Sequence, residues 1–221
     1  MPSGFKNYII EKIGKEFFYM KTNDERLEQL FNLLRELDYI DVKDIPNIDL
    51  YMDQVTTFME SHLGAMKRYD DDKILTKTMI NNYAKNNLLP SPVKKKYTQE
   101  HMILLVFIYY FKNLLSFNDI ETILSYITEN HFGEEQLPLV DVYTEVFTLE
   151  HQQMINLMRD VKQKFRAAEK TFQQVEDEQS KEDLQLFAFI CELAFDVYLK
   201  KRMIEQLCDE LRAENPTTKK K

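Results

Sequence analysis

The stretch LTKTMINNYAKNNLLPSPVKKKYTQEHMILLVFIYYFKNLLSFNDIETIL, residues 75–124, decides the fold. Its apolar spacing predicts a short helix over residues 76–86 and a very apolar helix over residues 98–115. The segment between them, residues 88–97, has two prolines that end the first helix, because proline fixes φ and has no amide hydrogen. The sequence SFND at 116–119 has capping-box spacing, which opens one more helix. We therefore expect three helices here, with strand limited to a short hairpin in the proline-containing loop.

Upstream of this stretch, the sequence predicts further helices. Apolar residues recur at spacings of three and four over residues 8–17, 27–37 and 50–62, which is typical of amphipathic helices. Pro46 and the neighbouring aspartates interrupt the chain between the last two of these segments. We expect a group of N-terminal helices over residues 1–40, followed by a separate central domain.

Downstream, two long helices are expected within residues 140–213. The first has a heptad seam that includes Phe165 and Phe172, and the second repeats the rhythm over residues 186–211. An acidic turn at 176–183 lets the two helices fold back into an antiparallel hairpin. Such a seam serves either an ordinary core within one chain or the pairing of two chains, and we expect a homodimer.

Composition favours helices and argues against several classes of protein. Only 4 glycines and 6 prolines occur in 221 residues, too few for many tight turns or a glycine-rich phosphate loop. The apolar run at 102–111 is about half the length that spans a bilayer. The first residues carry acids and show no secretion-signal cleavage site. Because Cys191 and Cys208 lack the spacing of a metal site or a redox pair, we expect both to be reduced thiols. Together, these features predict a cytoplasmic protein without a membrane partner.

The net charge of −8 is unevenly distributed along the chain. Residues 73–101 contain six lysines and one acid, Glu100, which gives this segment +5 and leaves −13 for the rest. A local basic segment on an acidic body is typical of a small DNA-contacting module. It is equally typical of a solvated loop.

The polar side chains of the basic segment suit DNA chemically. Asparagine can pair with the adenine edge, and lysine with guanine or phosphate. Lysines in a proline-stiffened loop would meet the phosphate backbone, a contact that is independent of sequence and sensitive to salt. The alternative is the solvated face of a small helix beside a basic loop. The residues that we expect to contact double-stranded DNA are Lys77, Thr78, Asn81, Asn82, Lys85, Lys94, Lys95, Lys96 and Tyr97.

About fifty residues of this stretch resemble the MerR-type winged helix-turn-helix domain of transcription regulators. Tyr83 takes the place of the aromatic residue at the end of that family's short helix, and Leu88 with Leu89 takes the place of its leucine step. Lys95 and Tyr97 match the basic-x-Tyr pattern of its wing. The resemblance implies a DNA-binding fold whose two copies pair through helices that follow the domain.

The chain departs from the MerR pattern at three places. Asn81 stands where an arginine is usual, which removes one phosphate clamp, and Asn87 replaces a glycine, although asparagine also adopts the left-handed conformation. The connection at residues 65–75 is longer than a normal helix-turn-helix turn. Because of these departures, the way in which MerR-type domains dock on DNA does not transfer directly to this chain.

The longer segment that begins at Leu50 is similar to a second family. LYMDQV, ILTKTMINNY and KKKYT are its matching sequences, and the family is an uncharacterised bacterial one known as domain of unknown function eighteen thirty-six. This resemblance implies a fold and no established activity.

The sequence thus predicts an all-α protein with a MerR-like winged helix-turn-helix core at 41–130, a C-terminal helical hairpin at 140–213 and a disordered tail at 214–221. The expected function is a DNA-binding transcription regulator, with an unknown effector as a further partner. The alternative is a protein-interaction module on the same scaffold that does not bind DNA. We expect that the protein is not an enzyme and holds no cofactor. We also expect no metal site, since pairs such as His131 with Glu134 lack a third ligand at a suitable spacing.

Overall fold

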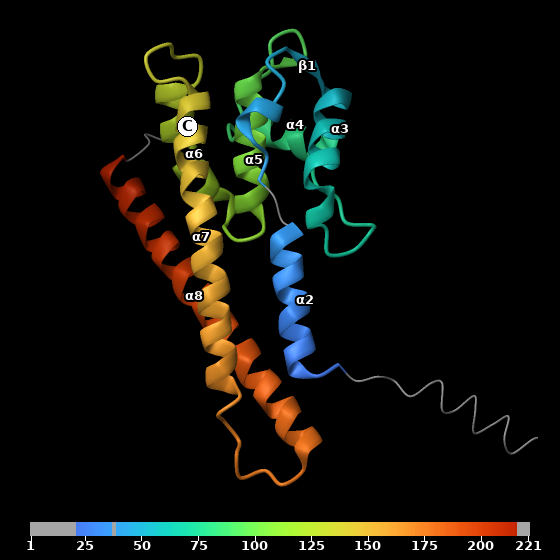
Figure 1. The fold of residues 1–221 in the computed structure, drawn as a ribbon. Helices are drawn as coiled ribbons and strands as arrows, with labels where there is room; N and C mark the ends of the chain where they lie inside the picture. The colour runs from blue at the N-terminus through green and yellow to red at the C-terminus, as the bar shows by residue number, and fades with distance from the viewer. Residues whose placement is uncertain (1–20, 37–38, 216–221) are drawn as a thin grey trace, which may run out of the picture.

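The computed structural model describes residues 21–36 and 39–215, which are mostly helical (Figure 1). The expected helix at 8–17 and most of the expected tail lie outside the described residues. Two 3₁₀ turns, η1 (Val42–Asp44) and η2 (Gly64–Met66), precede and follow the first helix of the central domain. The α-helices of the described chain are α2 (Asn23–Glu36), α3 (Met52–Leu63), α4 (Lys77–Lys85), α5 (Gln99–Lys112), α6 (Phe117–His131), α7 (Leu139–Ala168) and α8 (Glu178–Glu214).

Two short strands differ from the sequence prediction. β1 (Leu50–Tyr51) pairs antiparallel with β2 (Lys96–Tyr97), so strand is not confined to residues 88–97. A hairpin does form within that loop, as a single bridge between Val93 and Lys96. The expectation of a helix from residue 50 was wrong by two residues, because these residues hydrogen-bond to a distant segment before α3 begins.

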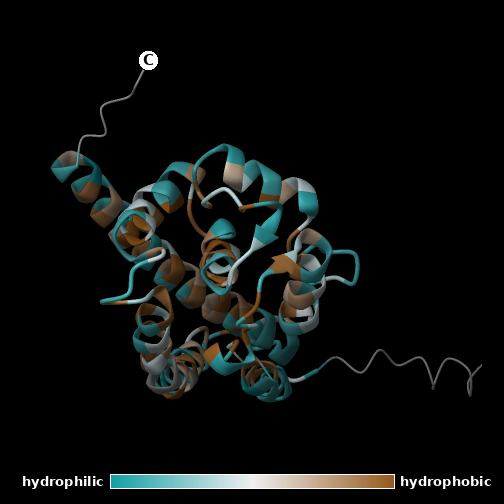
Figure 2. Cartoon of the chain, turned by 90° about the horizontal axis from the view of Figure 1, so that it is seen from above, coloured by the Kyte–Doolittle hydropathy of each residue, from teal (hydrophilic) through white to brown (hydrophobic). Residues whose placement is uncertain are grey.

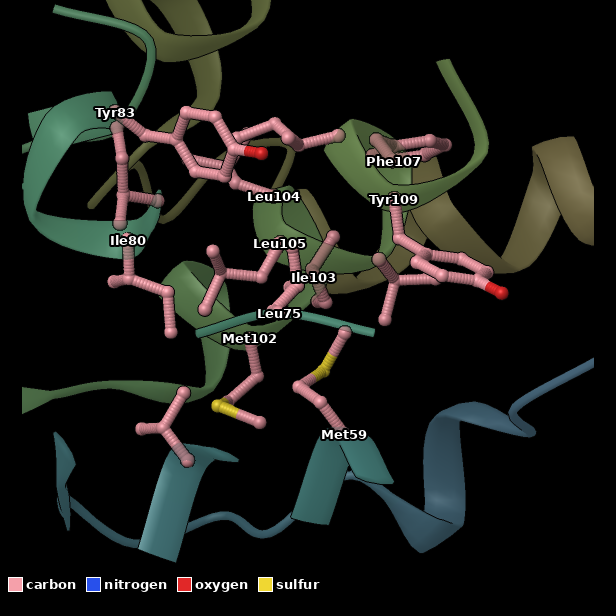
Figure 3. Packing of buried hydrophobic residues seen from close by; sticks show 14 of the residues in the cluster. Met59, Leu75, Ile80, Tyr83, Met102, Ile103, Leu104, Leu105, Phe107 and Tyr109 are labelled. Carbon is pink, nitrogen blue, oxygen red and sulfur yellow. The ribbon is translucent and has the colours of Figure 1, made fainter. Parts of the chain in front are cut away.

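The core of the protein is built around α5. Residues 102–109 of this helix are all buried, and side chains from α3, α4, α6 and the first half of α7 pack around them. Figure 2 shows hydrophobic segments turned inward among the helices, and Figure 3 shows α5 side chains between those of α4 and α3. This placement explains why α5 is apolar on nearly every side. None of the described helices is long and apolar enough to cross a membrane.

The core joins the start of the central domain to α7. The Tyr143 hydroxyl, which is buried, donates a 2.6 Å hydrogen bond to the carbonyl of Ile40. Burial also raises the pKa of this tyrosine, so the hydroxyl keeps its proton and remains a donor. The central packing unit therefore extends from residue 40 into α7, beyond the expected end at residue 130.

A second, smaller cluster packs α2 against α7 and α8. The Phe165 ring on α7 meets the Phe189 ring on α8 edge to face, with ring centroids 5.3 Å apart, and Leu27 of α2 completes the contact. The predicted seam is correct up to Ala168, where α7 ends. Phe172 lies beyond the helix with a φ of 55°, so its assignment to the seam was wrong.

The second half of α8 leaves α7 and runs against α6 (Figure 1). Arg212 donates to the carboxylate of Asp119, and its Nε donates to Thr122 at 3.0 Å. The same Asp119 carboxylate accepts from the hydroxyl of Ser116 at 2.6 Å, in the capping box that the sequence predicted. One buried carboxylate therefore begins α6 and also ties the end of α8 to the central domain.

Candidate nucleic-acid interface

Helix α4 separates a buried face from a polar one. Thr76 caps its start, as expected, by accepting a 3.2 Å hydrogen bond from the amide of Met79. Ile80 and Tyr83 point into the core, with 0% and 8% of their surface exposed. The opposite side, called here the α4 polar face, is fully on the surface and consists of Lys77, Thr78, Asn81, Asn82 and Lys85.

One lysine of the α4 polar face already has a partner. The Lys77 ammonium forms an ion pair with the carboxylate of Asp53 in the first turn of α3, and both side chains are well exposed. Exposed pairs of this kind contribute little to stability and break readily. The pair bridges the first turns of α3 and α4, and sequence patterns could not indicate it because the two residues are far apart along the chain.

The end of α4 has the geometry that the sequence predicted at Asn87. This residue has a φ of 61°, in the left-handed region where glycine and asparagine are favoured. The amide of Leu88 donates to the carbonyl of Tyr83 at 2.9 Å, and the amide of Asn87 donates to that of Ala84 at 3.4 Å. This is a Schellman motif, which ends the helix and turns the chain into the basic loop, residues 88–97.

The tip of the basic loop is a tight turn made of two lysines. The amide of Lys96 donates to the carbonyl of Val93 at 3.0 Å, and the two residues between them, Lys94 and Lys95, have φ values of 52° and 64°. Positive φ at both central positions is the requirement of a type I′ turn, for which Asn-Gly is the preferred pair. Both lysine side chains are exposed.

The residues that follow the tip anchor the loop. Lys96 pairs with Tyr51 across the two strands, and its ammonium lies 5.9 Å from the centre of the Tyr51 ring. Tyr97, which the sequence placed among the DNA contacts, is a core residue with 3% of its surface exposed. It turns inward because successive residues of a strand point to opposite sides, so Lys96 is on the surface and Tyr97 is not.

His101 packs against the end of the basic loop. Its Nδ1 accepts a 3.1 Å hydrogen bond from the amide of Thr98, so His101 takes part in the capping box at the start of α5. The ring is buried, with 3% of its surface exposed, and makes T-shaped contacts with the rings of Tyr97 and Phe132. Burial lowers the pKa of His101, and the nearby Pro90 carbonyl and Asp49 oppose this in part.

We expect the stability of the protein to fall when the pH drops below about 6.5, the ordinary pKa of histidine. The folded pKa of His101 is lowered, so the unfolded chain takes up a proton first and stability is lost as the pH falls from the unfolded value toward the folded one. The variant His101→Gln keeps an acceptor in the capping box and cannot titrate in this range. Urea unfolding at about pH 7.5 and pH 5.5 should show a smaller loss for the variant. Equal losses in both proteins would exclude His101 as the cause.

A lysine in the core region positions the start of α4. The Lys112 ammonium of α5 donates a 2.8 Å hydrogen bond to the carbonyl of Ile74, just before the Thr76 cap. Burial lowers the pKa of Lys112, with Asp72 opposing this. Sequence patterns offered no signal for this role, since Lys112 reads as an ordinary last-turn lysine.

Possible metal ligands do not cluster in the part of the chain that the structure describes. Across residues 21–36 and 39–215, no three His, Cys, Asp or Glu side chains lie together as metal ligands would. In the acidic loop before α4, the carboxylate of Asp72 accepts from the amides of Arg68 and Tyr69, which makes it part of a turn.

Comparison with known proteins identifies the central region. The model of one family, described as "Domain of unknown function (DUF1836)", matches residues 40–147. Residues 40–147 form a DUF1836 domain. No curated protein and no solved structure matches the chain.

The DUF1836 domain coincides with the main packing unit of the structure. Its first residue, Ile40, accepts the hydrogen bond from Tyr143, and its last, Phe147, stacks on the Tyr143 ring at a centroid distance of 4.2 Å. The domain contains the α4 polar face and the basic loop. Helix α2, the second half of α7 and α8 lie outside it.

Proposed function

We propose that this chain is a DNA-binding transcription regulator, and that the α4 polar face and the basic loop of its DUF1836 domain contact double-stranded DNA. The proposal rests on a surface that combines five exposed polar residues of one helix with lysines on the neighbouring loop. In it, the lysines meet phosphates and set the affinity, while Asn81 and Asn82 reach base edges and set the preference for sequence.

We further propose that α3, α4, the basic loop, α5 and α6 form a MerR-like winged helix-turn-helix. Three local features support this: the left-handed Asn87 at the glycine position of the family, the tight hairpin turn in the loop, and the pairing of that loop with a strand just before α3. The long connection between α3 and α4 remains a departure from the MerR pattern, and so does Asn81.

One observation carries the proposal, namely the conformation of the two lysines at the tip. Among the described residues, four that are not glycine have positive φ, and two of them are Lys94 and Lys95. A left-handed conformation costs an ordinary residue roughly 1–2 kcal/mol. Strain of this kind persists mainly at functional sites, where a required side chain outweighs backbone preference. Two adjacent cations held outward on a stiff turn suit contact with a phosphate backbone.

The double variant Lys94→Asn with Lys95→Gly separates stability from function. Asn-Gly is the favoured pair for this turn, so the variant should unfold at a higher temperature, with a gain of about 1–3 kcal/mol. The same change removes two phosphate contacts, so the slope of log affinity against log salt should fall in magnitude by about 1.8. Thermal unfolding and fluorescence anisotropy with a random-sequence duplex measure the two effects.

Two results would count against the proposal. If the wild type is not retained by heparin or duplex DNA even at low salt, the proposed regulator function is wrong. The α4 polar face and the basic loop would then be a surface for a protein partner. If the more stable double variant binds DNA with an unchanged salt dependence, the loop tip does not touch the phosphates.

A further inference from the structure

We propose that the N-terminal segment, residues 5–17, docks on the outer side of α8 within the same chain. The segment lies outside the described residues, and its apolar spacing is typical of an amphipathic helix. Its docking site is a row of side chains on the first half of α8, called here the outer α8 stripe. The stripe consists of Leu184, Phe187, Cys191, Phe195 and Tyr198.

The outer α8 stripe lies away from the side of α8 that packs within the described chain. Its members follow each other at spacings of three, four, four and three residues, which keeps them on one face of the helix. At 3.6 residues per turn, this face is turned by roughly 120–180° from Phe189, which packs on Phe165 of α7. Phe187, Phe195 and Tyr198 are accordingly 61%, 63% and 60% exposed.

The exposed area of the outer α8 stripe indicates a docking surface. Three aromatic rings of this exposure present roughly 300–400 Å² of apolar surface. The largest apolar patch on a typical monomer is about 300–600 Å², and such patches often mark interaction sites. The stripe therefore needs a partner of about one amphipathic helix.

The N-terminal segment offers an apolar face of matching length. Phe5, Ile9, Ile13 and Phe17 recur every four residues, so in a helix they share one face that is about 18 Å long. The outer α8 stripe spans 14 residue steps and is about 21 Å long by the same rise per residue. A helix of this pattern buries its apolar face by packing on another apolar surface.

The start of α2 brings the segment close to the start of α8. The side-chain amide of Asn23 donates a 2.9 Å hydrogen bond to the carbonyl of Glu182, so the first turns of the two helices lie side by side (Figure 1). Residues 18–22 connect the segment to α2, and five extended residues span about 17 Å. A helix is about 10 Å wide, so this connection is long enough to reach around α8.

The same connection determines the direction of docking. Phe17, at the end nearer α2, lies against Leu184, and the segment then runs antiparallel to α8, which places Ile9 beside Cys191. A short tether also favours this occupant over any other, because it holds the segment at an effective concentration of about 1 mM.

The test is disulfide formation between the segment and the native Cys191 in the full chain. The variant Ile9→Cys, oxidised with diamide at about 1 µM protein to suppress contacts between chains, should form an intrachain disulfide with Cys191 that peptide mapping detects. The matched control is Glu11→Cys, on the opposite side of the segment helix. The disulfide should form at least about tenfold faster in Ile9→Cys, because the two Cα atoms must come within about 7 Å. Cys208 is buried and does not compete.

A second measurement removes the apolar face of the segment. Cys191 should react with a maleimide at least about tenfold faster in Ile9→Glu with Ile13→Glu than in the wild type, because the docked segment covers it. Asn7→Glu with Gly14→Glu adds the same two charges on the other side of the segment helix and should leave the rate unchanged.

The proposal is overturned if Ile9→Cys forms no intrachain disulfide, or forms it no faster than Glu11→Cys. A disulfide that forms only between chains assigns the outer α8 stripe to another copy and also overturns it. So does a Cys191 that reacts equally fast in the wild type and in Ile9→Glu with Ile13→Glu. These results are independent of DNA binding, since all the variants keep the lysines of the α4 polar face and the basic loop.

Discussion

Replacement of Leu105 by alanine should lower the free energy of unfolding by about 2–5 kcal/mol. Leu105 lies on α5 with none of its surface exposed, among side chains of α3 and α4 (Figure 3). Removing three carbon atoms there loses their burial and leaves a cavity that the packed helices cannot close. For a chain of this length the midpoint of thermal unfolding should fall by roughly 5–15 °C.

An exposed leucine provides the control for this substitution. Leu33→Ala on α2, at a position that is 51% exposed, should change the free energy of unfolding by less than about 0.5 kcal/mol. Urea unfolding of both variants measures the difference. A loss below about 1 kcal/mol for Leu105→Ala would mean that α5 is not the centre of the core.

Replacement of Lys94, Lys95 and Lys96 by alanine should reduce affinity for duplex DNA by two to three orders of magnitude at about 50 mM salt. Each lost phosphate contact lowers the magnitude of the salt slope by about 0.9, and the three losses should add to about 2.7. The loss should be the same for every DNA sequence, because phosphate contacts carry no base information.

The matched control removes three lysines from outside the DUF1836 domain. Lys162, Lys170 and Lys200 are exposed on α7, on the loop after it and on α8, and their replacement by alanine changes the net charge by the same amount. This variant should bind DNA nearly as well as the wild type. If both variants lose the same affinity for duplex DNA, binding depends only on the overall charge and the basic loop is not a specific contact site.

Local features of this structure could be predicted from the sequence because their causes are local. The Thr76 cap, the capping box of α6 and the left-handed Asn87 each depend on residues within one turn of each other. The helices also follow from apolar spacing, and so does the outward direction of the α4 polar face, since Ile80 and Tyr83 must point inward.

The remaining features depend on contacts between distant segments. The two-residue strand at Leu50 shows no periodicity and exists only because β2 pairs with it. That pairing turns Tyr97 into the core, contrary to its expected role on the surface. The Lys77–Asp53 ion pair has the same kind of origin, and so does the burial of His101 between two rings.

The end of the heptad seam illustrates the limit of periodicity. Phe172 continues the three-and-four spacing, yet α7 stops at Ala168. The carbonyls of Glu169 and Thr171 instead accept hydrogen bonds from the buried side chain of Gln185, at 2.8 and 3.1 Å. The chain turns there because α8 supplies donors for the end of α7, which the spacing of apolar residues cannot indicate.

The most direct test of DNA binding is the association constant of the wild type with a random-sequence duplex, measured by fluorescence anisotropy between about 50 and 200 mM salt. The lysines that we propose as DNA contacts are Lys77, Lys85, Lys94, Lys95 and Lys96. If all five neutralise phosphates, log affinity should fall against log salt with a slope of about −4.5, or about −3.6 if Lys77 keeps its partner Asp53. A slope near zero, or no binding at the lowest salt, would contradict the proposal that this surface contacts DNA.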